Sequence, residues 1–167
     1  MMNCRWRIGY GEDIHALKAG RALILGGVKI AYPCGLDAHS DGDVVYHALA
    51  DALLGSVAAG DIGKWFPPSD QSITGIDSSK IVSFAFEKVQ EKGYQIGNVD
   101  IAIACEKPHL ASYLPLMQQN IASLLHIEPE AISLKAMTNE GFDAVGQGKA
   151  IRAVALVLVC PQEENEK

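Results

Sequence analysis

Short apolar runs alternate along the chain with longer segments of helical spacing. Runs bounded by Gly, Pro or polar residues are typical of strands, and apolar positions three and four residues apart are typical of helices. The predicted strands are Arg5–Tyr10, Ala22–Leu25, Val28–Ile30, Val99–Cys105, Ile132–Met137 and Ile151–Val159. The predicted helices are Val44–Ala58, Asp77–Lys92 and Ala111–Leu125. This order predicts an α/β (α+β layered) fold in which a small mixed β-sheet carries its helices on one face.

Turn and cap residues support several of these boundaries. Gly26-Gly27 joins two short strands and predicts a tight hairpin. Asp77 or Ser78 is suited to cap the second helix, and Gly93 is suited to end it. The segment Gly60–Thr74, which contains Pro67-Pro68, is predicted as a loop.

The last strand, Ile151–Val159, is almost uninterruptedly apolar. A strand without polar alternation is expected to be buried on both faces. A small single sheet has helices for only one of its faces, so a partner subunit is needed for the other. The sequence therefore predicts an oligomer.

Length and composition limit the remaining possibilities. The chain has 167 residues, which suits one domain over residues 1–160, followed by a polar tail over residues 161–167. The four cysteines, Cys4, Cys34, Cys105 and Cys160, form no C-x-x-C pair, so no zinc ribbon or redox pair is predicted. Without a secretory signal in this sequence, reduced thiols and a cytoplasmic location are expected.

Charge and hydropathy exclude two classes of partner. The formal net charge is −6, which disfavours nucleic-acid binding through a broad basic patch. No apolar run approaches the roughly 20 residues of a membrane span, so no membrane partner is expected. An anionic substrate would need local cations, either bound metals or well-placed lysine and arginine residues.

Asp13, His15 and His47 are the most informative chemical feature of the sequence. Asp13 and His15 follow the first strand two residues apart, so a continuing extended backbone places both side chains on one face. His47 falls in the first turns of the following helix. One carboxylate and two imidazoles form a ligand set for a zinc-like cation, and three ligands leave a fourth position open to substrate. The alternative is a surface Asp-x-His pair and an unrelated core histidine.

The residues around His47 predict how its ring is held. The segment Ser40-Asp41-Gly42-Asp43 is typical of a helix start, because Asp43 follows Ser40 by three residues as in a capping box. Asp43 and Asp51 lie four residues before and after His47, on the same helical face. We expect one of these carboxylates to accept the second ring N–H and fix the tautomer. A nucleophilic triad of Ser40, His39 and Asp43 is disfavoured, because neighbouring residues do not normally align in that way.

Several motifs together resemble the 2-C-methyl-D-erythritol 2,4-cyclodiphosphate synthases, and the similarity spans Arg7 to Val159. The motifs are Arg-Ile-Gly-Tyr-Gly-Glu-Asp-Ile-His (7–15), Ala-His-Ser-Asp-Gly-Asp-Val (38–44) with His47, Gly-Asp-Ile-Gly-Lys-Trp-Phe-Pro (60–67), Gly-Ile-Asp-Ser (75–78), Gly-Asn-Val-Asp (97–100), Glu-Lys-Pro (106–108) and Lys-Ala-Met-Thr-Asn-Glu (135–140). Their order and extent make the resemblance specific.

The resemblance implies a reaction and an assembly. The 2-phosphate of 4-diphosphocytidyl-2-C-methyl-D-erythritol 2-phosphate attacks the β-phosphorus of the same molecule, CMP leaves, and a cyclic diphosphate remains. Family members are homotrimers whose three active sites lie between adjacent subunits. The substrate supplies its own nucleophile, so the protein has to position two phosphates and neutralise their charge.

The resemblance also implies roles for individual residues. Asp13, His15 and His47 match the zinc ligands, Glu140 matches a residue near a second cation (Mg²⁺ or Mn²⁺), and His39 and Thr138 match transition-state stabilisers. All of these except His47 would also contact substrate. The other matched substrate-binding positions are Asp61, Ile62, Gly63, Phe66 and Asp70 near the sugar, Cys105, Glu106, Lys107, Pro108, His109, Leu110 and Ala111 around cytidine, and Ser40, Met137, Asn139 and Phe142.

Structural alternatives exist for three of these residues. His39 could serve only as a helix-capping loop residue, Asp61 as an N-cap or turn former, and Glu140 as a solvated acid at a strand end. The chain also departs from the family pattern at His109, where lysine is common, and at Val145, which aligns with an arginine in many relatives. Pro68 replaces an acidic residue that many relatives carry.

Two other functions fit parts of the pattern. A metal-dependent phosphohydrolase would use water in place of the internal phosphate and would give a linear product. A non-catalytic trimeric module that binds nucleotides or isoprenoid phosphates would release no product. Product analysis and turnover separate both from a cyclase.

Overall fold

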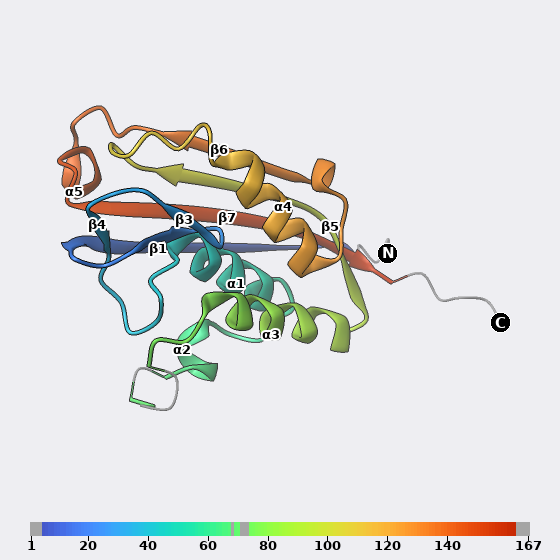
Figure 1. Ribbon diagram of the computed structural model, residues 1–167. Coiled ribbons are helices and arrows are strands. Elements are labelled where there is room, and N and C mark those ends of the chain that lie inside the picture. Colours follow the sequence, from blue (N-terminus) through green and yellow to red (C-terminus); the bar gives the residue numbers. More distant parts are fainter. Residues whose placement is uncertain (1–4, 68, 71–73, 163–167) are drawn as a thin grey trace.

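The computed structural model describes residues 5–67, 69–70 and 74–162 (Figure 1). Within these ranges one sheet has the strand order β4-β1-β7-β5-β6. Its strands are β1 Arg7–Ala19, β4 Cys34–Leu36, β5 Tyr94–Ala104, β6 Ile132–Met137 and β7 Ala150–Pro161. β5 and β6 are parallel and the other neighbours are antiparallel, so the predicted mixed sheet is confirmed. The predicted hairpin is also confirmed: β2 Leu23–Leu25 pairs with β3 Val28–Ile30.

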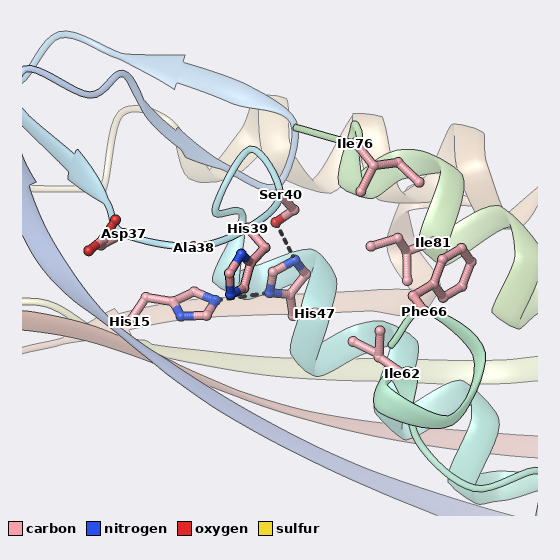
Figure 2. A pocket seen from close by; sticks show the side chains of 10 residues that line it. All are labelled: His15, Asp37, Ala38, His39, Ser40, His47, Ile62, Phe66, Ile76 and Ile81. Carbon is pink, nitrogen blue, oxygen red and sulfur yellow. Dashed lines mark hydrogen bonds between the residues drawn. The ribbon is translucent and has the colours of Figure 1, made fainter. Parts of the chain in front are cut away.

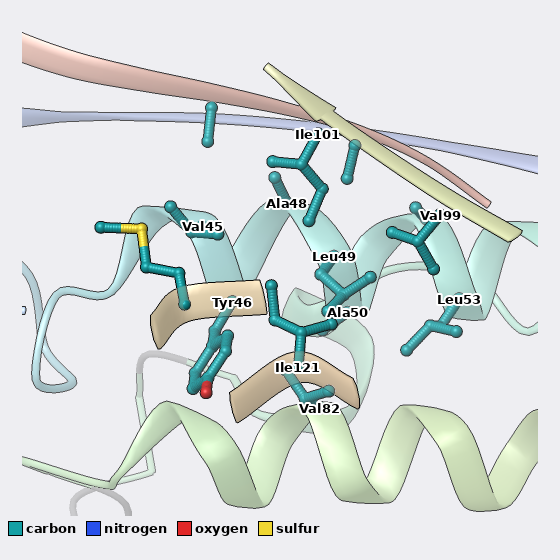
Figure 3. Packing of buried hydrophobic residues seen from close by; sticks show 14 of the residues in the cluster. Val45, Tyr46, Ala48, Leu49, Ala50, Leu53, Val82, Val99, Ile101 and Ile121 are labelled. Carbon is teal, nitrogen blue, oxygen red and sulfur yellow. The ribbon is translucent and has the colours of Figure 1, made fainter. Parts of the chain in front are cut away.

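The principal helices lie on one face of the sheet, as predicted (Figure 1). The helices are α1 Val44–Ser56, α2 Ile62–Trp65, α3 Ser78–Glu91, α4 Leu114–Leu125 and α5 Asp143–Gly146, with a 3₁₀ turn, η2, at Pro129–Ala131. α1 lies directly on β1 and β7, and α3 packs against α1. Figure 3 shows Leu49 of α1 between the β5 side chains Val99 and Ile101 and the helix residues Val82 and Ile121.

Two glycines of β1 allow α1 to approach the sheet closely. A Cβ on Gly9 would lie 1.8 Å from the carbonyl oxygen of Ala52, and one on Gly11 would lie 2.0 Å from that of Ala48. No side chain fits at such distances, so β1 presents bare backbone to a helix face lined with alanine. This close contact also sets how far His47 lies from Asp13 and His15.

The opposite face of the sheet is apolar and exposed. Its large hydrophobic side chains include Ile8 (73% exposed), Tyr10 (57%), Ile14 (50%) and Leu156 (44%). Within a single chain only one face of the last strand is buried, and burial of the other face by a partner subunit stays a prediction. The β7 residues that point toward the helices are buried, while the alternate ones stay partly accessible.

The structure corrects several predicted boundaries. β4, α2 and α5, each of three or four residues, were not predicted. α4 begins at Leu114 rather than Ala111, with Tyr113 as its N-cap and a proline in its first turn, where the missing N–H costs nothing. α1 ends at Ser56 rather than Ala58, whose backbone is left-handed (φ 56°). Pro68 lies outside the described residues.

Candidate active site

Asp13, His15 and His47 converge on one point, as the sequence predicted. Asp13 Oδ2 lies 2.9 Å from both His15 Nε2 and His47 Nδ1, and the two ring nitrogens lie 3.0 Å apart. Asp13 and His15 project from the helix-facing side of β1, and His47 comes from the first turn of α1. Ligands of a tetrahedral zinc lie about 3.3 Å apart at bond lengths of about 2.0–2.1 Å. The donor types and their spacing therefore fit a zinc-like cation.

The environment of Asp13 keeps its carboxyl group ionised. Burial raises the pKa of Asp13, but hydrogen bonds and charge attraction from His15 and His47 outweigh burial and hold that pKa well below its usual range. An ionised carboxylate is the state required of a metal ligand. This is the only group of three or more His, Cys, Asp or Glu side chains with metal-ligand spacing in the described part of the chain.

The second ring nitrogen of His47 does not contact a carboxylate, so the predicted bond to Asp43 or Asp51 is wrong. Nε2 lies 3.0 Å from the hydroxyl oxygens of both Ser40 and Ser78. Asp43 and Asp51 do lie four residues before and after His47 along the chain. Their carboxylates, however, accept hydrogen bonds from other segments. Asp51 accepts the N–H of Ile62 (2.7 Å) and so ties α2 to α1.

Asp43, not Ser40, is the N-cap of α1, so the predicted capping box is also wrong. Its buried carboxylate accepts the N–H groups of Val45 and Tyr46. It also accepts those of Gly26 and Gly27 in the hairpin turn. Free N–H groups at the helix start and at the turn both need an acceptor, and this one carboxylate serves both.

A cavity of about 520 Å³ opens beside the metal-ligand cluster (Figure 2). One end is polar and the other is formed by isoleucine and phenylalanine side chains. Its lining residues are His15, Asp37, Ala38, His39, Ser40, His47, Ile62, Phe66, Ile76 and Ile81. None of these described lining residues is lysine or arginine.

Six of the predicted site residues line this cavity: His15, His39, Ser40, His47, Ile62 and Phe66. Asp61, Gly63 and Asp70 lie in the same segment but are not among its described lining residues. Asp61 is the N-cap of α2, where its side chain accepts the N–H of Lys64 (2.9 Å), so its structural role is confirmed. Sequence reasoning assigned no role to Ile76 and Ile81, because apolar residues near a helix start carry no chemical signal of their own.

The remaining predicted residues gather at the carboxyl ends of β5 and β6. These strands are parallel, so the loops that follow them lie together: the N–H of Cys105 donates to Met137 O (2.9 Å), and that of Asn139 donates to Glu106 Oε1 (2.7 Å). Thr138 donates its hydroxyl hydrogen to Glu140 Oε1 (2.8 Å). The predicted cytidine segment, Cys105–Ala111, is therefore adjacent to Thr138 and Glu140.

Within one chain these two groups of residues do not meet. Asp13 pairs with Ala153, Ala153 with Ile103, and Ile103 with Ala136, which places three strand spacings between the metal ligands and β6. At about 4.8 Å per strand, this separation is roughly 14 Å. The predicted site is thus divided into two parts of one chain, a metal part and a β5–β6 loop part.

Comparison with known proteins identifies the family. The sequence pattern described as the YgbB family matches residues 6–160. The chain belongs to the YgbB family. A similar curated relative, 2-C-methyl-D-erythritol 2,4-cyclodiphosphate synthase of Moorella thermoacetica, is 48% identical over 157 residues, which cover 94% of this chain and 96% of the relative.

Solved structures related to the YgbB fold agree with this assignment. The bifunctional IspDF of Campylobacter jejuni superposes with a TM-score of 0.91 at 35% identity over 95% of this chain, which corresponds to 43% of that longer chain. A CDP complex of Plasmodium falciparum IspF superposes with a TM-score of 0.84 at 35% identity, covering 95% of this chain and 97% of that one.

Two of the three departures from the YgbB family pattern, Val145 and His109, lie in the described part of the chain. Val145 is buried (1% exposed) against Ala104 and Ala150, so its position packs α5 rather than presenting a side chain to substrate. His109 is exposed, and its Nε2 lies 3.1 Å from Lys107 Nζ, so a lysine ammonium group remains in this loop. Arg152 forms an ion pair with Glu12 on the face of the sheet opposite the helices.

Cys105 should resist thiol reagents in the folded protein. Burial raises the pKa of its thiol to about 11, and the thiol donates to Lys107 O (3.1 Å). At pH 8 only about one molecule in a thousand would carry the reactive thiolate. We expect native Cys105 to be alkylated by iodoacetamide far more slowly than in urea, as followed by peptide mass spectrometry. Equal rates in both states would show that the loop does not shield it.

Proposed function

We propose that this chain is a 2-C-methyl-D-erythritol 2,4-cyclodiphosphate synthase, with 4-diphosphocytidyl-2-C-methyl-D-erythritol 2-phosphate as its substrate. The observation that carries the proposal is the Asp13, His15 and His47 cluster, which has an open side toward a cavity of about 520 Å³. The chain that carries this cluster is also similar to a curated enzyme of this name, with nearly half of the residues identical over almost its full length.

The reaction needs no nucleophile from the protein. An oxygen of the substrate's 2-phosphate bonds to the β-phosphorus, the bond from that phosphorus to the α-phosphate oxygen breaks, and CMP leaves with the electron pair. No water is consumed and no external group is transferred, so the enzyme belongs to the phosphorus–oxygen lyases. Its task is to hold two phosphates in line and to balance their charge.

Two metal positions follow from the side chains present. Asp13, His15 and His47 would hold Zn²⁺, and Glu140 would contribute to holding Mg²⁺ or Mn²⁺ together with phosphate oxygens. When bound, these cations supply positive charge that polarises the phosphoryl groups. His39 and Ser40 line the cavity wall next to His47 and would orient a phosphate there, while Ile62 and Phe66 cover the sugar and exclude water.

Thr138 is expected to act in the transition state. Its hydroxyl lies beside Glu140 at the end of β6 and would donate to charge that develops on the phosphoryl oxygens. Thr138→Val keeps the shape and removes this donor. We expect kcat to fall on the order of 10²-fold with a much smaller change in KM. Full kcat in a folded Thr138→Val protein would exclude Thr138 from the mechanism.

The functional form is proposed to be a homotrimer with each active site between two subunits. Two observations support this: the exposed apolar face of the sheet, and the roughly 14 Å between the metal part and the β5–β6 loop part of one chain. Phe142, 76% exposed beside Glu140, is also placed to contact a neighbour. A second subunit would bring its Thr138 and Glu140 to the metal part of the first.

Mixing two inactive variants tests this shared site. His47→Ala disables the metal part and Glu140→Gln the loop part, so a site between one subunit of each kind can recover both intact halves. Random co-assembly should restore up to about a quarter of parental activity. If the two variants recover no activity after they are unfolded and reassembled together, the shared site is contradicted. An active monomer in light scattering would also contradict it.

We further propose that the enzyme works in the cytoplasm on a small molecule, with no nucleic-acid partner. In the described residues no helix has the length and hydropathy needed to cross a membrane.

A catalytic role is tested by counting CMP released per subunit. Many equivalents per subunit are expected, whereas a non-catalytic binding module would release none.

A further inference from the structure

Ser78 connects His47 to the carboxylate of Asp41, which lies outside the predicted metal-ligand set. It is the first residue of α3 and is 0% exposed. Its Oγ lies 3.0 Å from His47 Nε2 and 2.6 Å from Asp41 Oδ1. Its backbone N–H donates to Asp41 Oδ2 at 3.1 Å. Asp41 therefore binds Ser78 through both of its carboxylate oxygens.

These contacts fix the direction of each hydrogen bond. An ionised carboxylate only accepts, so Ser78 has to donate its single hydroxyl hydrogen to Asp41. The oxygen of Ser78 is then left as an acceptor toward His47 Nε2, and Nε2 has to carry the ring hydrogen. In a neutral imidazole the lone pair then lies on Nδ1, the atom that faces Asp13 and His15.

Ser40 cannot impose this tautomer alone. Its Oγ accepts the N–H of Gly42 (3.1 Å), and its hydroxyl hydrogen has no fixed acceptor other than His47 among the described residues. It could therefore donate to Nε2 as well as accept from it. The direction comes from Asp41 through Ser78.

We infer that Ser78 and Asp41 are positioning residues that hold His47 with Nδ1 free to bind the metal. This inference rests on the proposed metal site and extends it to two residues outside the ligand set. Groups that orient a metal-binding histidine typically change metal affinity by about 10–100-fold when removed. The expected effect is therefore on metal binding itself, before any substrate is present.

Metal affinity of the zinc-loaded protein, measured by competition with a chromophoric chelator, tests the inference. Ser78→Ala should weaken zinc binding by about 10–100-fold. Ser56→Ala is the matched control, because Ser56 is also buried (1% exposed) but donates only to Leu53 O within α1. The control should stay within about twofold of the parent.

A double-variant comparison separates a chain of contacts from general loosening. If Asp41 acts through Ser78, Asp41→Asn should weaken zinc binding on its own, and adding it to Ser78→Ala should cost little more. Losses that simply add, or a Ser78→Ala affinity equal to that of the Ser56 control, would overturn the inference. If Ser78→Ala does not fold, Ser78→Cys fills the same space with a weak acceptor and should lose affinity in the same way.

This result is independent of the reaction. If the parent protein binds zinc tightly but forms no cyclic product, the proposed function is refuted. The positioning role of Ser78 and Asp41 is unaffected by that result. If the parent is fully active but neither Ser78→Ala nor Asp41→Asn changes the zinc affinity, only the positioning role of Ser78 and Asp41 is refuted.

Discussion

His47→Ala is expected to remove stoichiometric zinc from the protein and to lower turnover by about 10³-fold or more. The imidazole supplies one of three converging donor atoms, and the remaining two, on Asp13 and His15, are adjacent on one strand. A cation on phosphoryl oxygens contributes several kcal/mol to the transition state, and each 1.36 kcal/mol is a factor of about ten in rate. Zinc content by atomic absorption and steady-state CMP release measure the two effects.

The fold should survive this substitution, because the His47 side chain lies at the edge of the cavity and not in the apolar core. His126→Asn is a suitable control: His126 is an exposed residue with left-handed backbone (φ 53°) at the end of α4, and asparagine tolerates that conformation. The control should keep its zinc and its activity. A folded His47→Ala protein with full zinc and full turnover would show that the cluster is not the metal site.

Gly11→Ala is expected to destabilise the fold strongly, although it adds only one methyl group. The new Cβ would lie 2.0 Å from Ala48 O and 2.6 Å from Ala52 N, and these are backbone atoms of α1. The helix would have to move off the sheet, which would separate His47 from Asp13 and His15. We expect a loss of about 3 kcal/mol or more from a total of about 5–15. Thermal unfolding should shift downward by roughly 10 °C.

Gly55→Ala is the matched control for this prediction. Gly55 lies in α1 on the side facing β1, but its nearest contact to an added Cβ is Tyr10 O at 3.7 Å, an ordinary van der Waals distance. Alanine should stabilise the helix by about 0.5–1 kcal/mol. If Gly11→Ala unfolds at the same temperature as the parent, the close helix–sheet contact does not determine stability.

Local patterns were enough to predict that Asp13, His15 and His47 converge on a candidate metal site. The two-residue spacing of Asp13 and His15 needs only an extended backbone, and β1 provides it. The start of α1 at Val44 and both ends of β6 at Ile132 and Met137 were also predicted, although the capping box expected before α1 was wrong. The YgbB family assignment followed from motifs in the right order.

Contacts between distant segments explain why some hydrogen-bond partners in the site were not predicted from the sequence. Asp43 is four residues from His47, but the hairpin turn at Gly26 and Gly27 takes its carboxylate. Ser78 is 31 residues from His47 and meets it only because α3 packs on α1. Such pairings depend on how elements pack, which a single sequence does not encode in any local pattern.

The central claim is that this chain closes a ring within one substrate molecule. Phosphorus NMR of the protein with 4-diphosphocytidyl-2-C-methyl-D-erythritol 2-phosphate and Mg²⁺ in ¹⁸O-labelled water tests it most directly. The account predicts that the substrate signals are replaced by those of a cyclic diphosphate and CMP in equal amounts, with no ¹⁸O in either product. A linear bisphosphate that carries ¹⁸O beside the CMP would show that water is the nucleophile and would contradict the account.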